Sequence, residues 1–513
     1  MSEHQHPRVK SDAPRPLRRR RLLVAAGVAA AVIGSSSGVA SPANPAQASP
    51  SIRPAVSDYA LISSGTTPPT SAQCVSVGRS CFGPAAIRAS YNVNPLYAQG
   101  VDGRGQTIAI VDSYGSDTMA HDLHVFDQAF GVAAMCGEEG VTCTPGMPTF
   151  SVLSVQGSPA TKAPPSTSNS PGQEDKAAWA LEVALDVEMS HAMAPGANIL
   201  LVTTPTAETL GVQGFPNMMK AEKYVVDNHL ATVISQSFGS SEAAFGSAKS
   251  LENLRDAFKA AAASGVTVLA SSGDSGTAEG KKTPVGQGGS AIPFASVSWP
   301  ASDPLVTGVG GTYLCTDPDN FTSRAVASSP AARCIANPTQ AEVGWTFSGG
   351  GFSQVFAKPA YQQALPAGST PIGATRGVPD VALQASAGTG ALVYLTLPPD
   401  GLSGLLCGPT PCSTGWYDIG GTSLSAPQWA GFVALGAQIN HGGLGLINAA
   451  LYKIGADPAR YAADFFDITT GNNTVDPTIP GYPATTGWDP ITGLGTPNVS
   501  VLIPDLVAAV NGN

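Results

Sequence analysis

Five short apolar segments between residues 107 and 309 constrain the fold of this chain more than any other feature. The first, Thr107–Asp112, is apolar at every position except its ends, which is typical of a strand buried on both faces of a parallel sheet. The other four have the same character: Asn198–Val202, Thr232–Ser235, Thr267–Ala270 and Leu305–Val309. Between them lie helical stretches at Asp175–Ala192, Met218–Asn228 and Leu251–Ala263. This alternation predicts a three-layer α/β fold in which helices flank a central, mostly parallel sheet.

The first 48 residues have the pattern of an export signal. Four arginines, Arg18–Arg21, precede an apolar run from Leu22 to Ile33 that is too short to cross a bilayer comfortably. Ala46-Gln47-Ala48 then provides a small-residue cleavage motif. We therefore expect a secreted protein with no membrane contact after signal cleavage. An uncleaved signal anchor is the alternative.

The eight cysteines fit the same compartment. They form four close pairs along the chain: Cys74/Cys81, Cys136/Cys143, Cys315/Cys334 and Cys407/Cys412. Pairing between neighbours is the simplest interpretation in an oxidising environment, although eight cysteines allow many other pairings.

The charge balance limits the partners of the chain. Charged residues make up 12% of the sequence and the formal net charge is −10, whereas soluble proteins usually contain about 25% charged residues. An acidic chain of this kind is a poor candidate for binding nucleic acid or anionic membranes. A surface with few ion pairs also loses little when carboxylates are protonated, so the composition suits an acidic medium.

A glycine-rich turn presents Ser423 at the start of an apolar helix. Gly420-Gly421-Thr422-Ser423 is followed by Pro427 and by the apolar stretch Trp429–Ile439. We expect the helix to begin at or near Ser423 with Pro427 in its first turn. The N–H of Ser423 would then lie at the positive end of the helix, where it can bind an oxyanion. This pattern indicates a nucleophile, and a simple helix N-cap is the structural alternative.

Three carboxylates are candidates for activating such a serine. Glu182 and Asp186 are four residues apart, so they share one face of the helical stretch Ala177–Val187, whose other residues are apolar. Two close carboxylates in a low-dielectric site tend to share a proton, although a structural role for the pair is possible. Asp274 follows a predicted strand, where open α/β sheets place their sites, in a Ser/Gly turn that would also suit an Asx-turn. No histidine has the context of a catalytic base, and His191 is expected to end its helix.

A C-terminal segment contains oxygen donors for a hard cation. Asp467-Ile468 precedes Thr485-Thr486-Gly487-Trp488-Asp489, which combines two carboxylates with the carbonyls of a glycine-containing loop. Such a set suits Ca²⁺. The spacing does not match an EF-hand, and an ordinary turn-rich loop fits these residues equally well.

Taken together, these motifs resemble the sedolisin family of serine-carboxyl peptidases, which have a subtilisin-like fold. The resemblance covers roughly residues 85–511 and includes Ser235–Gly239 and Ser348–Ser353. It implies Ser423 as nucleophile, Glu182 as general base, Asp186 as its partner and Asp274 in the oxyanion hole. It also implies substrate contacts from Ser237, Phe238 and Gly239. One Ca²⁺ ion would be held by the side chains of Asp467 and Asp489 and by the carbonyls of Ile468, Thr485 and Gly487.

The resemblance implies a secreted, acid-acting, monomeric peptidase whose partners are protein or peptide substrates. We expect a signal peptide over residues 1–48 and a short Ser/Pro-rich segment over 49–84, in place of the large folded pro-segment usual in the family. The peptidase domain with its calcium site would follow over 85–513.

Three other hypotheses remain. A divergent subtilisin-type peptidase would use Asp112 as its triad acid, but it lacks a histidine in a His-Gly-Thr context. A glycosidase would use Glu182 and Asp186, yet such carboxylates usually come from different elements and stand roughly 5 Å or more apart. A secreted, non-catalytic binding protein on a peptidase scaffold is the third. In the carboxylate mechanism Asp112 has no role, and Asp112→Asn is expected to keep near-normal rates.

Overall fold

The computed structural model of the protein describes residues 53–54, 56–156, 173–205, 214–280, 291–328, 334, 336–397, 406–407 and 410–512. The export signal predicted for residues 1–48 lies outside the described residues.

The central sheet has the mostly parallel topology that the sequence predicts. Its strand order is β11-β10-β8-β6-β3-β5-β4, with β14 also paired to β10. Every pairing in it is parallel except that of β10 with β11. The strands are β3 (Thr107–Ser113), β4 (Phe150–Ser154), β5 (Asn198–Thr204), β6 (Val233–Gln236), β8 (Thr267–Ser271), β10 (Thr307–Leu314), β11 (Glu342–Gly344) and β14 (Val381–Gln384).

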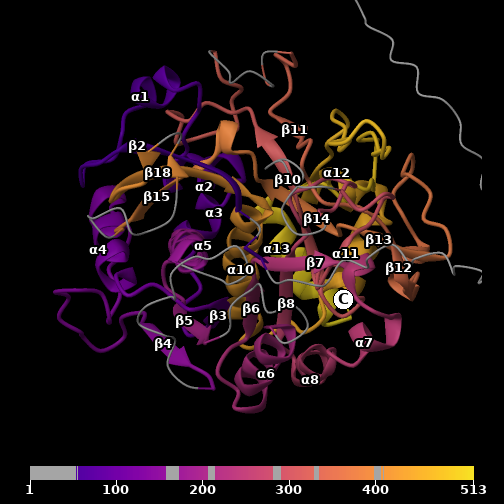
Figure 1. The fold of residues 1–513 in the computed structure, drawn as a ribbon, viewed down its shortest axis with the longest axis horizontal. Helices are drawn as coiled ribbons and strands as arrows, with labels where there is room; N and C mark the ends of the chain where they lie inside the picture. Colours follow the sequence, from indigo (N-terminus) through magenta and orange to yellow (C-terminus); the bar gives the residue numbers. More distant parts are fainter. Residues whose placement is uncertain are drawn as a thin grey trace, which may run out of the picture. The chain divides into compact units, whose positions relative to one another are not determined.

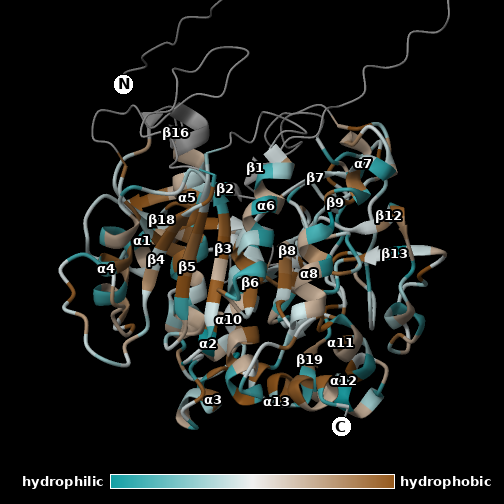
Figure 2. Ribbon diagram, turned by 90° about the horizontal axis from the view of Figure 1, so that it is seen from below, coloured by the Kyte–Doolittle hydropathy of each residue, from teal (hydrophilic) through white to brown (hydrophobic). Residues whose placement is uncertain are grey.

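Helices cover both faces of this sheet, so the structure has three layers (Figure 1). One face carries α5 (Gln173–Met193), α10 (Thr422–Asn440) and α13 (Val499–Val510), and the other carries α6 (Gly214–Asp227) and α8 (Asp256–Ser264). Strand β3 contributes side chains to the cores on both faces of the sheet, because successive side chains of a strand point to opposite faces. Ile108 and Ile110 join the core beneath α5 and α10, whereas Ala109 and Val111 join the core beneath α6 and α8. Coloured by hydropathy, the central strands are accordingly largely apolar (Figure 2).

Helix α10 lies in the middle of the molecule and is buried all round. Each residue from Thr422 to Ala437 is buried, and the helix packs on β6, β8, β10 and β14 as well as on α5 and α13. Strand β18 (Gly415–Gly421) runs directly into it. Among the described helices, none has the length and apolarity needed to span a membrane.

Two smaller sheets join the N-terminal segment to the rest of the fold. In one, β18 lies between β15 (Ala391–Leu395) and β2 (Val56–Ser63); in the other, β7 (Phe238–Ser241) lies between β1 (Arg53–Pro54) and β9 (Ser298–Trp299). The described part of segment 49–84 is thus built into the sheets of the main unit.

The remaining elements lie around these layers. The strands are β12 (Gly351–Ala357), β13 (Thr375–Val378), β16 (Leu406–Cys407), β17 (Thr410–Pro411), β19 (Phe465–Phe466) and β20 (Thr496–Pro497). The helices are α1 (Ser71–Ser76), α2 (Pro84–Ser90), α3 (Asn94–Ala98), α4 (Met119–Phe130), α7 (Ala248–Glu252), α11 (Asn448–Gly455) and α12 (Pro458–Asp464).

The structure corrects the sequence interpretation at several elements. The helix predicted over Leu251–Ala263 is two helices, α7 and α8, because the chain turns where Arg255 forms a paired contact with the buried Asp303 (2.5 and 2.8 Å). Helix α6 begins four residues earlier than predicted. Strand β4 was not predicted because most of its residues are exposed at the sheet edge, and β14 because it has only four residues.

Three of the four predicted disulfides are confirmed: Cys74–Cys81, Cys136–Cys143 and Cys315–Cys334. Cys412 is disulfide-bonded as well. The side chain of its expected partner, Cys407, lies outside the described residues.

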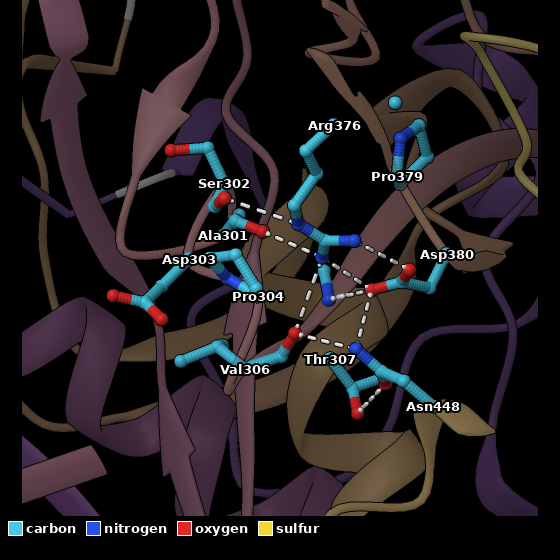
Figure 3. Close-up of polar contacts among 12 residues, drawn as sticks. Ala301, Ser302, Asp303, Pro304, Val306, Thr307, Arg376, Pro379, Asp380 and Asn448 are labelled. Carbon is cyan, nitrogen blue, oxygen red and sulfur yellow. Dashed lines mark hydrogen bonds and ion pairs between the residues drawn. The ribbon is translucent and has the colours of Figure 1, made fainter. Parts of the chain in front are cut away.

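A buried ion pair ties the strands on one side of the sheet together (Figure 3). The fully buried guanidinium of Arg376, on β13, donates to both oxygens of Asp380 (3.0 and 2.7 Å). Its other N–H groups donate to three main-chain carbonyls, those of Ala301, Ser302 and Val306. Asp380 in turn accepts from the main-chain N–H of Gly308 (2.8 Å). The pair therefore fixes β13 and β14 to the chain entering β10.

We predict that Arg376→Met lowers the free energy of unfolding by about 3–5 kcal/mol, because it leaves the buried carboxylate of Asp380 without its counter-charge. Lys223→Met is the matched control, since it removes an exposed ion pair with Asp227, which is worth at most about 1 kcal/mol. Urea unfolding followed by circular dichroism measures both. Equal losses in the two variants would contradict this account of the pair.

Candidate active site

The predicted catalytic residues meet at the carboxyl ends of the central strands. Asp274 lies three residues beyond the end of β8, and Ser237 directly follows β6. Ser423 reaches the same place from β18 and α10, while Glu182 and Asp186 come from α5, which packs along α10. This is the edge at which the sequence places the site.

Ser423 is the second residue of α10. Its N–H therefore has no acceptor within the helix, as predicted for an oxyanion donor. Its hydroxyl donates to the main-chain carbonyl of Ser237 at 3.4 Å, a long and weak contact. The helix begins at Thr422, so Pro427 lies in the second turn and not in the first, as we had expected.

Asp274 is bound to the residue immediately before Ser423. One of its carboxylate oxygens accepts from both the main-chain N–H and the hydroxyl of Thr422, each at 2.8 Å. The hydroxyl of Thr422 also accepts from the N–H of Gly273 (3.0 Å), which has a φ of +105° that favours glycine. These bonds hold the loop after β8 against the start of α10. They therefore place Asp274 beside the N–H groups expected to bind an oxyanion.

Glu182 and Asp186 are both fully buried on α5. Burial raises the pKa of Glu182 well above its ordinary value, and the charges of Asp186, Asp112 and Asp274 raise it further. Interaction with the hydroxyl of Ser423 acts in the opposite direction and lowers it. The pKa of Asp186 is raised by burial and by Asp112, and Ser237 opposes this by donating to Asp186 at 2.9 Å. The pair therefore favours a shared proton.

Asp112, which has no role in the carboxylate mechanism, belongs to the same buried cluster. It lies near the end of β3, is fully buried, and neither of its carboxylate oxygens accepts a hydrogen bond from any described residue. Burial raises its pKa to about 8. Its charge raises the pKa of Glu182 and of Asp186, so three carboxyl groups titrate together. Only the fold reveals this, because residue 112 is far from 182 and 186 in the sequence.

The side chains of the segment expected to bind substrate, Ser237–Gly239, are largely occupied within the protein. The hydroxyl of Ser237 is occupied by Asp186, and Phe238 is fully buried against Trp179 and Phe215. Their side chains therefore belong to the interior. Their main-chain groups and those of Gly239 are the remaining candidates for holding an extended peptide, and in this structure Phe238 and Gly239 pair with the two-residue strand β1.

The described histidines take no part in this site. His191 lies inside α5, two residues before its end, where its Nε2 contacts Asp127 (3.1 Å) and the carbonyl of Ala133 (2.9 Å). His121 and His124 contact Glu139 and Glu138. No described histidine contacts Ser423, so the carboxylates are the candidate general bases.

The predicted calcium ligands lie close together. Asp467 and Asp489 both influence the pKa of Tyr461, whose hydroxyl donates to Asp467 at 3.0 Å. Burial raises the pKa of Asp489 to about 7. The carbonyls of the other expected ligands accept no hydrogen bond from any described residue; these are Ile468, Thr485 and Gly487. Two carboxylates and three unbonded carbonyls fit a hard cation. Within the described ranges no group of three or more His, Cys, Asp or Glu residues could hold a metal, but the expected set contains only two.

Comparisons with known proteins agree with this geometry. A family model described as the subtilase family matches residues 166–446. The chain belongs to the subtilase family. Its similarity to kumamolisin and sedolisin agrees with the resemblance of its motifs to the sedolisin family.

Kumamolisin from Bacillus sp. (strain MN-32) is 31% identical over 435 residues, which cover 83% of this chain and 64% of kumamolisin. Sedolisin from Pseudomonas sp. (strain 101) is 33% identical over 290 residues, which cover 56% of this chain and 43% of sedolisin. The chain thus spans less than two thirds of the length of these curated relatives. A solved structure described as Pseudomonas sedolisin, a serine-carboxyl proteinase complexed with two molecules of pseudo-iodotyrostatin, matches with a TM-score of 0.59 and 26% identity. That match covers 84% of this chain and 98% of the sedolisin chain.

The carboxylate cluster predicts that this subtilase fold is more stable in acid. The pKa of Asp112 is about 8 in the folded chain, compared with about 3.9 in an unfolded one. The folded state therefore holds this proton more tightly, so stability present below about pH 4 is lost as the pH rises toward 8. Replacing Asp112 with Asn removes this contribution. We expect the fall in Tm between about pH 4 and pH 8 to shrink by several degrees.

Differential scanning calorimetry across this pH range provides the measurement. Asp256→Asn is the control, because the side chain of Asp256 is 71% exposed. If Asp112→Asn and the control show the same decline in Tm, Asp112 does not titrate as part of the cluster.

Proposed function

We propose that the chain is a secreted serine-carboxyl peptidase that hydrolyses peptide bonds in acid. One observation carries the proposal: Ser423 lies at the N-terminus of a buried helix, its hydroxyl lowers the pKa of the buried Glu182, and no described histidine contacts it. A serine needs an adjacent base to act as a nucleophile, and we assign that role to Glu182.

Glu182 would remove the proton from the hydroxyl of Ser423 as the oxygen attacks a peptide carbonyl carbon. Asp186 is a positioning residue that acts through Glu182. Its charge raises the pKa of Glu182, and its own carboxyl group is oriented by Ser237. The same proton, passed on to the leaving amine, completes formation of the ester. Water then hydrolyses the ester and regenerates the serine.

The developing oxyanion would be held by the main-chain N–H of Ser423 and by Asp274. A carboxyl group donates a hydrogen bond only when it is protonated. Acid keeps Asp274 in that form, and it also lets Glu182, Asp186 and Asp112 share protons and avoid carrying three like charges together. For these reasons we assign the activity to acidic pH.

Secretion and a peptide substrate complete the proposal. Disulfides persist in oxidising compartments, and at least three join parts of this chain. The predicted signal of residues 1–48 would direct the chain there. Protein or peptide substrates follow from the chain's similarity to sedolisin, which is described as a serine-carboxyl proteinase.

Replacing Glu182 tests this mechanism directly. Glu182→Gln keeps the shape of the side chain but removes the proton acceptor, so kcat/KM should fall by about 10²–10⁴-fold. Ser423→Ala should abolish hydrolysis. Cleavage of a quenched-fluorescent peptide library between pH 2 and pH 8 measures both.

Glu188→Gln is the matched control for this experiment. Glu188 lies on the same helix and is also fully buried with a raised pKa, but its carboxylate accepts from the N–H of Tyr394. It should retain nearly full kcat/KM. A Glu182→Gln variant as active as Glu188→Gln would exclude Glu182 as the base.

We also propose that one Ca²⁺ ion binds between Asp467 and Asp489. The carbonyl oxygens of Ile468, Thr485 and Gly487 would complete its ligands. When bound, the ion supplies positive charge that stabilises the two carboxylates and holds the loops together. It has no part in the chemistry at Ser423.

Removal of calcium should therefore lower stability. We expect about one Ca²⁺ per chain by elemental analysis and a lower Tm in EDTA, since a ligand bound to the folded state stabilises it. Asp489→Asn should lower Tm and lose the response to EDTA, whereas Asp476→Asn, at a partly exposed loop position, should keep that response. A calcium-free protein whose Tm is indifferent to EDTA would refute the site.

A further inference from the structure

The segment between α4 and β4, residues 131–149, has few buried side chains. The structure describes all of these residues, and among them only Val132, Met135 and Glu138 are buried. The disulfide of the segment joins two of its own residues, so it does not tie the segment to another element. Because little apolar surface is buried here, polar contacts carry much of the attachment of this segment to the rest of the fold.

Histidines of α4 provide two of these contacts. One carboxylate oxygen of Glu138 accepts from the main-chain N–H of Met135, and the other contacts Nδ1 of His124 at 3.2 Å. Beside this pair, Nδ1 of His121 contacts the carboxylate of Glu139 at 2.5 Å. Two histidines one turn apart on α4 thus face two consecutive glutamates of the segment.

A third histidine joins the segment to α5, which packs against α4 (Figure 1). His191 is fully buried, and its Nε2 lies 3.1 Å from the carboxylate of Asp127 on α4 and 2.9 Å from the main-chain carbonyl of Ala133 in the segment. A ring nitrogen between two oxygen acceptors has to carry a proton. His191 therefore donates to both oxygens and connects both helices with the segment.

The buried groups of this cluster hold their protons tightly. The pKa of Glu138 is raised to about 7, mainly by burial and also by the neighbouring Asp127. Burial alone would lower the pKa of His191, but the charge and the hydrogen bond of Asp127 outweigh it and the pKa is raised.

These shifts have the same sign in their effect on the segment. A free Glu and a free His titrate at about 4.3 and 6.5, so a closed segment binds both protons more tightly than a released one does. The stability that Glu138 contributes to the closed form is complete below about pH 4 and is lost as the pH rises through about 7. The contribution of His191 is complete below about pH 6.5 and is lost as the pH rises through its raised pKa.

Further titratable groups face the cluster from α4, α5 and β15. Burial raises the pKa of Asp122 on α4 to about 6. It raises that of Glu188 on α5 well above its ordinary value, and the charges of Asp122 and Asp127 add to this rise. Burial also raises the pKa of the hydroxyl of Tyr394 on β15. Ionisation of the two carboxyl groups at higher pH would therefore add negative charge beside Asp127, in the same direction as Glu138.

We propose that residues 131–149 form a pH-sensitive clasp, which is closed on α4 and α5 in acid and released at neutral and alkaline pH while the rest of the fold persists. In acid a neutral Glu138 lies beside the ion pair of His191 with Asp127. At higher pH both carboxylates carry charge and His191 is neutral. Release of the segment exposes Glu138 to water and relieves this repulsion. The clasp requires no peptidase activity.

Oxidation of methionine measures the release. Met135 is fully buried in the closed segment, and a thioether has no titratable proton, so dilute hydrogen peroxide reports its exposure in the same way at each pH. The full chain carrying Ser423→Ala is used, so that hydrolysis cannot cut a released segment. Peptide mass spectrometry should show the rate of Met135 oxidation rising by about tenfold or more between pH 5 and pH 8. Met193, fully buried on α5, should stay protected at both.

Glu138→Gln distinguishes a switch from a merely structural side chain. The amide keeps an acceptor for the N–H of Met135 and is neutral at every pH, so Met135 should remain protected at pH 8. Glu139→Gln is the matched control and should keep the full rise, because the side chain of Glu139 is 65% exposed and exposed ion pairs contribute little. His191→Gln keeps a donor but cannot carry charge, so Met135 should be oxidised faster already at pH 5.

Three results would overturn the clasp. Equally slow oxidation of Met135 at pH 5 and pH 8 would show that the segment stays closed. Parallel rises for Met135 and Met193 would show that the whole fold opens. Loss of protection at pH 8 in Glu138→Gln, to the same extent as in the parent chain, would exclude Glu138 as the switch. None of these results bears on the peptidase proposal, which depends on the loss of hydrolysis in Glu182→Gln.

Discussion

Helix α10 has almost no solvent face, and the arrangement of the whole molecule follows from that constraint. A helix that is buried all round has to be enclosed by other elements, and here the sheet, α5 and α13 do so. Close approach of α5 requires glycine at position 431, where a Cβ atom would lie 2.6 Å from the Cβ of Met193. The contact between these helices brings Ser423 and Glu182 to the same place.

The same enclosure makes the site costly to maintain. Carboxyl groups are transferred from water to an interior in which the described residues provide Glu182, Asp112 and Asp186 with few donors and no cationic partner. Such groups respond by keeping their protons. At neutral pH the cluster would destabilise the fold, because several buried carboxylates would have to carry charge. At low pH the same groups are protonated, and at most one of them need be charged. In this fold, stability and the proposed chemistry would favour the same range of pH.

Much of the fold could be predicted from the sequence because its signals are local. Continuous apolar runs revealed β3, β5, β6, β8 and β10, and close spacing revealed three disulfides. The spacing of Glu182 and Asp186 placed both on one helical face. Features that arise only when distant segments meet were missed. Asp112 joins the cluster through the neighbouring strands, and Arg376 and Asp380 acquire their importance from carbonyls on another part of the chain. Strand β1 has no strand signature at all, because its pairing is imposed by the edge of β7.

The confirmed disulfides have a consequence that differs from global stabilisation. They close loops with sequence separations of only 7, 7 and 19 residues, and cross-links of this kind restrict the unfolded chain less than long-range ones do. We expect them instead to keep the short segments that they close from adopting the extended form that a peptidase binds. Under the proposed function, a secreted peptidase that meets other copies of itself would resist cleavage at these cross-linked segments. In a reducing medium it would be nicked at these turns well before its interior came apart.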